Sequence, residues 1–231
     1  MTAVVQDMRK TGANALARAD RVRITEIFHS LQGESRTVGL PTVFVRLTGC
    51  PLRCVYCDTE YAFHGGEWRG IDEVCRTVAN YATHHVTVTG GEPLAQFNAD
   101  RLIHALADAG HEVSVETSGA MDISVLDERI VRVMDIKTPG SGEMARNRWE
   151  NLDLLRPHDQ IKFVICDRAD YEWSRDLFRS KVLNKRCEVL FSPEHEGVKP
   201  ADLADWILED RLPVRFQLQL HKYLWGDEPG R

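Results

Sequence analysis

Residues 49–61 read GCPLRCVYCDTEY, and this stretch places three cysteines, Cys50, Cys54 and Cys57, within eight positions. The preceding run, TVFVRLTG (42–49), is apolar and β-branched, so we expect the cysteines in a loop that leaves a strand. Structural zinc sites prefer two separated pairs of Cys or His, and no second such pair follows. Three thiolates on a 4Fe–4S cluster leave one iron open, which indicates a functional site.

Two alternatives to this interpretation stay open at the level of the sequence. The cysteine triad could be a zinc site that borrows a distant histidine, or a chance group of buried thiols. The other cysteines, Cys75, Cys166 and Cys187, are isolated in helical or strand patterns. We interpret them as small core residues.

Length and composition restrict the class of protein. The 231 residues suffice for one domain with a sizeable core, and the net charge of −6 argues against sequence-independent nucleic-acid binding. No apolar run approaches the ~18 residues of a transmembrane helix, and the N-terminus lacks the apolar segment of a signal peptide. We therefore expect a cytoplasmic protein, without a membrane or nucleic-acid partner, whose cysteines are thiols or ligands rather than disulfides.

Short apolar runs alternate with helical patterns, which predicts βαβ units and an α/β fold with a mostly parallel sheet. The expected strands lie at 21–30, 42–50, 85–91, 111–119, 132–138, 160–166, 187–193 and 214–222. The expected helices lie at 71–82, 98–110, 168–182 and 199–210. Polar, glycine-containing segments follow several strands, at the edge where parallel sheets bind ligands. We predict an N-terminal arm (1–22) and a single domain (23–231) with one site.

The cysteine motif, with an aromatic residue before its last cysteine, resembles the signature of radical S-adenosylmethionine (SAM) enzymes. In that family the open iron binds the amino and carboxylate groups of SAM. Four segments resemble later motifs in the same order: TGGEP (89–93), VETSG (115–119), DIK (135–137) and SPEHEG (192–197). The resemblance implies SAM contacts from Tyr56, Gly90, Gly91, Glu92, Glu116, Ser118, Asp135, Ile136, Lys137, Ser192, Pro193, Glu194 and His195.

The segment EIFHSLQGESRTVGLPTVFVRLTGCPLRCVYCDT (26–59) is similar to the 7-carboxy-7-deazaguanine synthase family of the queuosine and 7-deazapurine pathway, and the match extends to HKYLW (221–225). The resemblance implies an incomplete, shortened radical SAM barrel of about six strands flanked by helices. It also implies conversion of 6-carboxy-5,6,7,8-tetrahydropterin to 7-carboxy-7-deazaguanine with loss of ammonia. A flavodoxin- or ferredoxin-type electron donor and a homodimer are implied in the same way.

A carboxylated, guanine-like substrate needs amide and carboxylate partners for its ring and a guanidinium for its carboxylate. By resemblance, Arg46 binds the carboxylate and Thr59 ligates Mg²⁺, for which a hydroxyl oxygen is suitable. The remaining implied substrate contacts are Leu31, Gln32, Gly33, Glu34, Thr89 and His221, and no general acid or base is assigned.

From the residues alone, simpler interpretations of these positions stay open. Arg46 could be a surface charge, Gln32 a polar loop residue and Thr59 a turn residue. His221, near the end of the expected last strand, could be a core histidine. Two other classes of protein also stay open: a radical SAM activase for a glycyl-radical partner, which would lack LQGE (31–34), and a non-catalytic zinc or iron–sulfur module.

Overall fold

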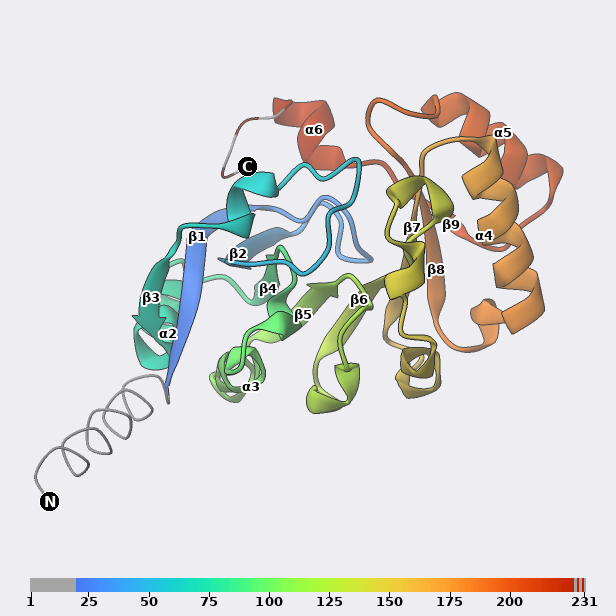
Figure 1. Ribbon diagram of the computed structural model, residues 1–231. Helices are drawn as coiled ribbons and strands as arrows, with labels where there is room; N and C mark the ends of the chain where they lie inside the picture. Colours follow the sequence, from blue (N-terminus) through green and yellow to red (C-terminus); the bar gives the residue numbers. More distant parts are fainter. Residues whose placement is uncertain (1–19, 227, 229, 231) are drawn as a thin grey trace, which may run out of the picture.

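In the part of the chain that the structure describes, seven parallel strands form most of a single open sheet. In the computed structural model, which describes residues 20–226, 228 and 230, the strand order is β3-β1-β2-β4-β5-β6-β7-β8-β9 (Figure 1). The strands are β1 (Arg21–Leu31), β2 (Pro41–Leu47), β3 (Glu67–Gly70), β4 (His85–Gly90), β5 (Glu112–Thr117), β6 (Val131–Asp135), β7 (Gln160–Ile165), β8 (Glu188–Pro193) and β9 (Arg215–Phe216). Pairing is parallel from β2 to β9, and the two end strands do not meet. The prediction of an incomplete, mostly parallel barrel is confirmed.

The helices lie in the connections between these strands. The α-helices are α2 (Ile71–Ala79), α3 (Ala99–Asp108), α4 (Arg168–Lys181), α5 (Pro200–Glu209) and α6 (Leu220–Trp225). The 3-10 helices are η1 (Glu60–Phe63), η2 (Pro93–Ala95), η3 (Ile123–Val125), η4 (Pro139–Ser141), η5 (Met144–Arg146), η6 (Trp149–Leu154) and η7 (Leu183–Lys185). No helix among the described residues is both long and apolar enough to cross a membrane.

The four predicted helices are confirmed as α2, α3, α4 and α5, and local sequence signals stabilise the first turn of two of them. Asp167 caps α4 by accepting a hydrogen bond from the backbone N–H of Asp170 (2.9 Å). Pro200 occupies the first turn of α5, where its missing N–H costs nothing. Asn98 directly precedes α3, but its side-chain amide donates to the Arg21 carbonyl (3.0 Å) and forms no capping hydrogen bond.

Two features of the sheet's first edge differ from the expected pattern. β1 runs antiparallel to β2, because residues 32–40 are too few for the crossover that parallel pairing needs. β3 was not predicted, since its four residues are short and show no apolar alternation. The predicted arm (1–22) lies mostly outside the described residues. Arg21 and Val22 belong to β1, so the sheet begins two residues before the expected boundary.

The predicted last strand at 214–222 is wrong over most of its length. β9 pairs with β8 only through Arg215 and Phe216, and α6 begins at Leu220. The alternation of QLQL resembles a strand, yet Leu218 is 41% exposed and Gln217 is buried. The chain leaves the sheet because the Leu220 N–H donates to the Gly33 carbonyl (3.2 Å) rather than to a strand. His221 therefore lies in a helix.

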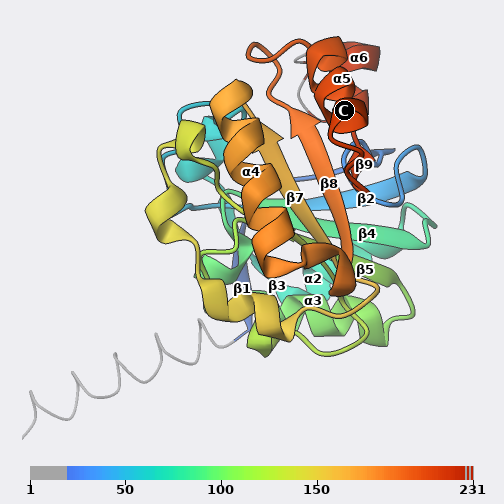
Figure 2. The ribbon, with the colours of Figure 1, turned by 90° about the vertical axis from the view of Figure 1, so that its right-hand side faces the viewer.

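The hydrophobic core occupies the outer face of the sheet. One cluster packs α2 and α3 against β1, β2, β4 and β5, and a second packs α4 and α5 against β6, β7 and β8 (Figure 2). Cys187 belongs to the second cluster, as predicted, whereas Cys75 and Cys166 are only half-buried. The opposite, inner face carries buried polar side chains, including Thr87, Thr89 and Lys162. That face is the wall of the site.

A buried ion pair joins the start of β6 to the turn before β7. Arg132 and Asp159 have side chains 2% and 0% exposed, with 3.2 Å between Nη1 and Oδ2. The Asp159 carboxylate also accepts from the backbone N–H groups of Arg132 and Arg156, each at 2.8 Å. These contacts fix the two strands that supply Asp135 and Lys162 to the site.

Replacing Asp159 by Ala should lower the free energy of unfolding by about 3–5 kcal/mol, because the Arg132 guanidinium is left buried without its counter-charge. Urea-induced unfolding followed by circular dichroism measures the change. The matched control is Asp153→Ala, which removes an ion pair to Arg186 whose carboxylate is 78% exposed, and which should cost less than about 0.5 kcal/mol. Equal effects of the two substitutions would contradict the role given to the buried pair.

Candidate active site

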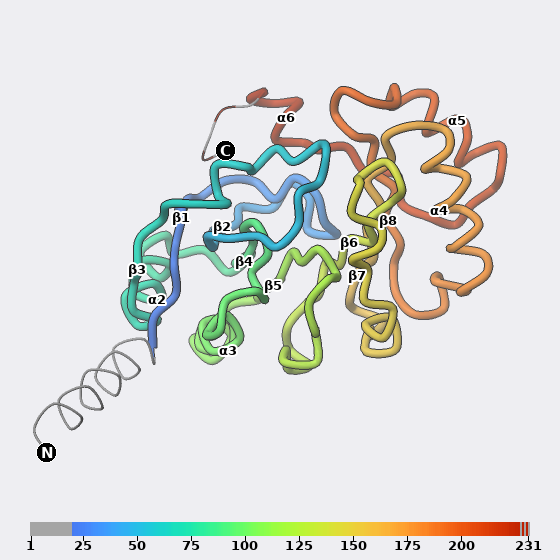
Figure 3. Tube along the Cα trace, in the orientation of Figure 1, coloured from blue at the N-terminus to red at the C-terminus, as the bar shows by residue number. Residues whose placement is uncertain are grey.

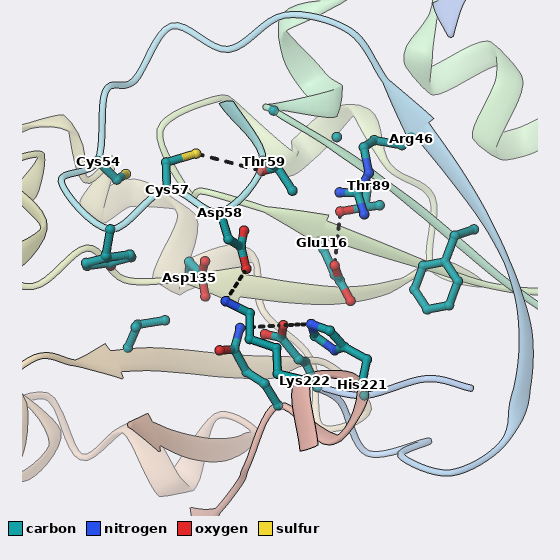
Figure 4. A pocket seen from close by; sticks show the side chains of 18 of the residues that line it. Arg46, Cys54, Cys57, Asp58, Thr59, Thr89, Glu116, Asp135, His221 and Lys222 are labelled. Atoms are coloured by element: carbon teal, nitrogen blue, oxygen red, sulfur yellow. Dashed lines mark hydrogen bonds and ion pairs between the residues drawn. The ribbon is translucent and has the colours of Figure 1, made fainter. Parts of the chain in front are cut away.

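One cavity at the carboxyl ends of the parallel strands collects most of the predicted site residues (Figure 4). The segment after β2 runs across these strand ends and α6 lies near it (Figure 3). The predicted residues that line the cavity are Leu31, Gln32, Gly33, Glu34, Arg46, Cys50, Cys54, Tyr56, Cys57, Thr59, Thr89, Gly90, Gly91, Glu116, Ser118, Asp135, Lys137, Glu194, His195 and His221.

Four predicted residues do not line this cavity. Ile136 belongs to the outer hydrophobic core, and Ser192 and Pro193 are buried at the end of β8. Glu92 is fully buried and accepts hydrogen bonds from the Thr117 hydroxyl (2.9 Å), the Ser118 N–H (2.7 Å) and the Leu94 N–H (2.9 Å). It ties the end of β4 to the end of β5 and presents no free oxygen to a ligand.

The three cysteines of the triad are free, half-buried and directed to the cavity from one loop between β2 and η1. Backbone contacts hold this loop on both sides. The Gly49 carbonyl accepts from the Glu92 N–H (2.9 Å), and the Val55 N–H donates to the Ser141 carbonyl (3.0 Å). The Arg53 N–H donates to the Glu143 carboxylate (2.6 Å). The loop therefore needs no regular structure to place its thiols.

Two glycines at the end of β4 allow the cysteine loop to lie this close. A Cβ at Gly91 would overlap the Gly49 carbonyl and the Cys50 Cβ, and one at Gly90 would overlap the backbone of Leu47. Any other residue at either position would displace the loop. Gly90 and Gly91 therefore help to position the cysteines, because they let the cysteine loop pack against the end of β4.

The donor set fits a 4Fe–4S cluster. Burial raises the pKa of the Cys54 thiol to about 11, so the thiol keeps its proton at neutral pH until a metal displaces it. Among the described residues, no group of three or more His, Cys, Asp or Glu converges on a single metal ion. A cubane cluster binds each thiolate through a different iron, so its three ligands do not have to converge on one point.

Two charged residues beside the triad are suited to a polar cofactor. The Lys137 ammonium lies 2.9 Å from Asp135 Oδ2 and 6.0 Å from the centre of the Tyr56 ring. Asp135 Oδ1 is buried and accepts no hydrogen bond among the described residues, although the Lys162 ammonium lies 3.4 Å from it. A hydroxyl or ammonium group of a ligand would satisfy it, which is what bound SAM could supply.

Arg46 lies at the far end of the cavity from the cysteines (Figure 4). Its Nε donates to the Glu26 carboxylate (2.7 Å), which also accepts from the Tyr61 hydroxyl (2.8 Å). The guanidinium carbon lies 5.8 Å from the ring centres of both Phe28 and Tyr61. Among the described residues, the two terminal nitrogens of the Arg46 guanidinium form no hydrogen bond. Together they can donate two parallel hydrogen bonds to a carboxylate. Arg46 is thus no surface charge.

Gln32 is buried and engaged within the protein. Its side-chain nitrogen donates to the Thr87 hydroxyl (3.1 Å) and the Glu116 carboxylate (3.3 Å), and its oxygen accepts from the Glu34 N–H (3.0 Å). Glu116 also accepts from the Thr89 hydroxyl (3.0 Å). Gln32 therefore orients Glu116. Glu116 itself, which the resemblance assigned to SAM, is hydrogen-bonded to the loop after β1 through Gln32.

The end of the chain closes one side of the cavity. A Cβ at Gly33 would overlap His221 Nδ1, so α6 packs directly on the loop after β1. The Gln219 amide donates to Glu34 (2.9 Å), and Lys222 pairs with Asp58 (3.2 Å) beside the last cysteine. His221 faces Glu34 Oε1 at 3.9 Å and lines the cavity rather than the core.

Thr59 directly precedes η1, and its carbonyl accepts from the Ala62 N–H (2.9 Å). The nearest partner of its hydroxyl is Cys57 Sγ at 3.7 Å, which is at most a weak hydrogen bond. The residue is both a turn residue, as its position suggests, and part of the cavity wall. Its hydroxyl oxygen is free to take a metal ion.

Several cavity residues carried little or no signal in the sequence. Lys162, in the middle of β7, has its ammonium 2.8 Å from Glu34 Oε2 and 3.4 Å from Asp135 Oδ1. Phe28 and Phe44 stack on the inner face of β1 and β2, with ring centres 5.0 Å apart. The alternation of those two strands contained a signal for the aromatic pair. For Lys162 the only signal was a charge inside an otherwise apolar strand, QIKFVI.

Residues 44–136 match the model of the radical SAM superfamily. The 7-carboxy-7-deazaguanine synthase of Koribacter versatilis is 46% identical over 222 residues, which cover 90% of this chain and 98% of the relative. Those of Chlorobaculum tepidum and Methanospirillum hungatei are 41% and 38% identical over the same share of this chain, and over 96% and 87% of their own.

Solved structures show the same fold. The crystal structure of QueE from Escherichia coli matches with a TM-score of 0.69 at 21% identity, over 89% of this chain and 97% of that chain. Streptococcus suis SuiB bound to the precursor peptide SuiA matches with a TM-score of 0.60 at 16% identity, over 92% of this chain and 53% of that chain. The identity to the curated relatives, over nine-tenths of its length, shows that this chain belongs to the 7-carboxy-7-deazaguanine synthase family of radical SAM enzymes.

Proposed function

We propose that this protein converts 6-carboxy-5,6,7,8-tetrahydropterin to 7-carboxy-7-deazaguanine with loss of ammonia. One observation supports this most directly: the cysteine triad and a set of carboxylate, amide and guanidinium groups line the same cavity. The reduced pterin carries N–H donors on its pyrimidine ring and a carboxylate at the opposite end. The cavity offers acceptors at Glu34 and Glu116 and a cation at Arg46, so the two patterns are complementary.

When bound, the cluster and SAM would supply a carbon-centred radical that takes a hydrogen atom from the substrate. The chain's part is to bind, orient and exclude water. Cys50, Cys54 and Cys57 would hold the cluster. Asp135 Oδ1, which accepts no hydrogen bond among the described residues, would accept one from a polar group of SAM. Arg46 would fix the substrate carboxylate, with Phe28 and Phe44 excluding water beside it.

Mg²⁺ is the third cofactor of the proposal, with Thr59 as its protein ligand. The support is the position of the hydroxyl in the cavity wall and its lack of a strong hydrogen-bond partner among the described residues. Mg²⁺ takes oxygen ligands and keeps several waters, so a single protein oxygen beside the substrate carboxylate is a suitable set.

Three further parts of the proposal are supported by the resemblance rather than by contacts. We place the protein in the cytoplasm, where its thiols stay reduced. We propose an external electron donor of the flavodoxin or ferredoxin type, because the cluster has to be reduced before it can cleave SAM and side chains do not supply that electron. A second copy of the chain would complete a homodimer.

Single replacements of Cys50, Cys54 or Cys57 by Ala should abolish cluster assembly, because each thiolate holds one iron. The measurement is iron and sulfide content after anaerobic reconstitution, with an electron paramagnetic resonance spectrum after reduction. Ala variants of Cys75, Cys166 and Cys187 are the matched controls and should keep the cluster. A cluster retained in Cys54→Ala, or lost in Cys187→Ala, would remove the assignment of the triad.

Replacing Arg46 by Ala should weaken substrate binding about thirtyfold, roughly 2 kcal/mol, by removing a charge-assisted contact in a buried pocket. SAM cleavage without substrate should survive, since the cysteine loop has other supports. Titration of substrate and chromatography of the cleavage products measure the two effects separately. Arg215→Ala, which removes an exposed pair with Glu188, is the control. Loss of SAM cleavage in Arg46→Ala would mean that Arg46 supports the cluster loop.

Turnover should rise with added Mg²⁺ and fall with a chelator if the Thr59 hydroxyl is a ligand. Thr59→Val keeps the shape and removes the oxygen, so it should lose the Mg²⁺ response while keeping cluster content and SAM affinity. Thr59→Ser keeps an oxygen and should retain part of the response. Turnover of the wild type that does not change between chelator-treated and Mg²⁺-supplied assays would leave Thr59 as a turn residue only.

A further inference from the structure

Lys162 is a buried cation at the centre of the cavity, and neither the family motifs nor the proposed mechanism uses it. Its side chain is 9% exposed. It projects from the middle of β7, where it lies in register with Asp135 on β6. Its ammonium contacts carboxylates from two other elements, Glu34 in the loop after β1 (2.8 Å) and Asp135 at the end of β6 (3.4 Å).

The other charges facing this ammonium come from every wall of the cavity. Glu116 projects from β5 and interacts electrostatically with both Lys162 and Glu34. The remaining cations have contacts of their own: Lys137 with Asp135, Arg46 with Glu26, and Lys222 with Asp58. The His221 ring lies 3.9 Å from Glu34. Lys162 is therefore the cation that lies between the substrate-side and the cofactor-side carboxylates.

We propose that Lys162 is a positioning residue that keeps Glu34 and Glu116 ionised at the same time, and thereby selects a ring whose edge carries several N–H donors. This inference rests on the proposed function, because the donor-rich edge is that of the pterin and of its guanine-like product. Two buried carboxylates close to each other cannot both stay ionised without a nearby cation. A protonated carboxyl would turn an O–H toward the N–H donors of the ring and keep only one uncharged oxygen as an acceptor, so the contact would be weaker.

The two carboxylates depend on Lys162 to different degrees. Burial disfavours the charge on Glu34, but Lys162 and His221 outweigh it and lower its pKa to about 2. For Glu116 burial prevails and raises the pKa, and Lys162 counteracts only part of that rise. Glu116 is thus the group whose ionisation is lost first when Lys162 is removed.

The direction of the pH dependence follows from this difference. Binding of a donor-rich edge is strong above the pKa of Glu116 and is lost as the pH falls through it. Without the Lys162 charge that pKa rises further, so the loss of binding moves to higher pH. Lys162→Met should therefore bind weakly at neutral pH and recover as the pH increases, whereas Lys162→Arg keeps the charge and should resemble the wild type.

The test is calorimetric titration of the anaerobically reconstituted protein, supplied with SAM, with 7-carboxy-7-deazaguanine between pH about 6 and about 9. At neutral pH, Lys162→Met should lose about tenfold or more in affinity, because removal of the ammonium raises the pKa of Glu116 further and increases the protonated fraction of its carboxyl. The analogue without the exocyclic amine should bind the wild type more weakly but bind Lys162→Met about as well as the full product. Lys185→Met, an exposed lysine in η7, is the control and should change nothing.

A second variant keeps the test decisive if Lys162→Met does not fold. Glu116→Gln cannot ionise, so its product affinity should not fall between neutral and acidic pH, whereas that of the wild type should. Equal pH profiles in Glu116→Gln and wild type, or in Lys162→Met and wild type, would overturn the inference while leaving the proposed function intact. A wild-type protein that does not bind the product at all would overturn both.

Discussion

Backbone packs directly on backbone where the cysteine loop crosses the end of β4, and the cofactor half of the site depends on that contact. Gly90 and Gly91 leave no side-chain volume between the turn and the Leu47–Cys50 segment. The next residue, Glu92, donates its N–H to the Gly49 carbonyl, and its carboxylate accepts a hydrogen bond from the Ser118 N–H at the end of β5. Three strand ends are thereby fixed relative to one another. The thiols are placed by this backbone arrangement, so the cluster meets ligands that the fold already holds together.

The inner face of the sheet carries more charged side chains than an ordinary hydrophobic core. Ion pairs between these side chains stabilise this arrangement. A buried charge without a partner costs several kcal/mol, so the cations inside the cavity lie beside carboxylates. The hydrophobic core lies on the outer face, where α2 to α5 cover the strands. This separation lets the inner face serve recognition without weakening the packing. Lys162 and Arg46 lie on the inner face and make no contribution to the outer core.

The sequence predicted those features that short segments determine by themselves. The cysteine spacing, the TGGEP turn and the four predicted helices depend on patterns within a few residues, and the structure places them as expected. The function of Lys162 depends on the register between β6 and β7, which no local pattern contains. The bonds of Gln32 to Thr87 and Glu116 are equally long-range. The strand predicted at 214–222 was wrong over most of its length for the opposite reason. The segment QLQL (217–220) has a local strand pattern, but the tertiary contact between Leu220 and Gly33 overrides it.

The contact between Leu220 and Gly33 also explains why the cysteine side and the Glu34 side of the cavity are not independent. None of the residues of α6 is buried, and Tyr223 on its surface is 82% exposed, so little apolar packing holds the helix. Its described contacts are polar and end on site residues: Gln219 on Glu34, the Leu220 N–H on Gly33, and Lys222 on Asp58. Glu34 takes Lys162 with one oxygen and Gln219 with the other. The charge that Lys162 maintains on Glu34 therefore also helps to hold α6 over the cavity.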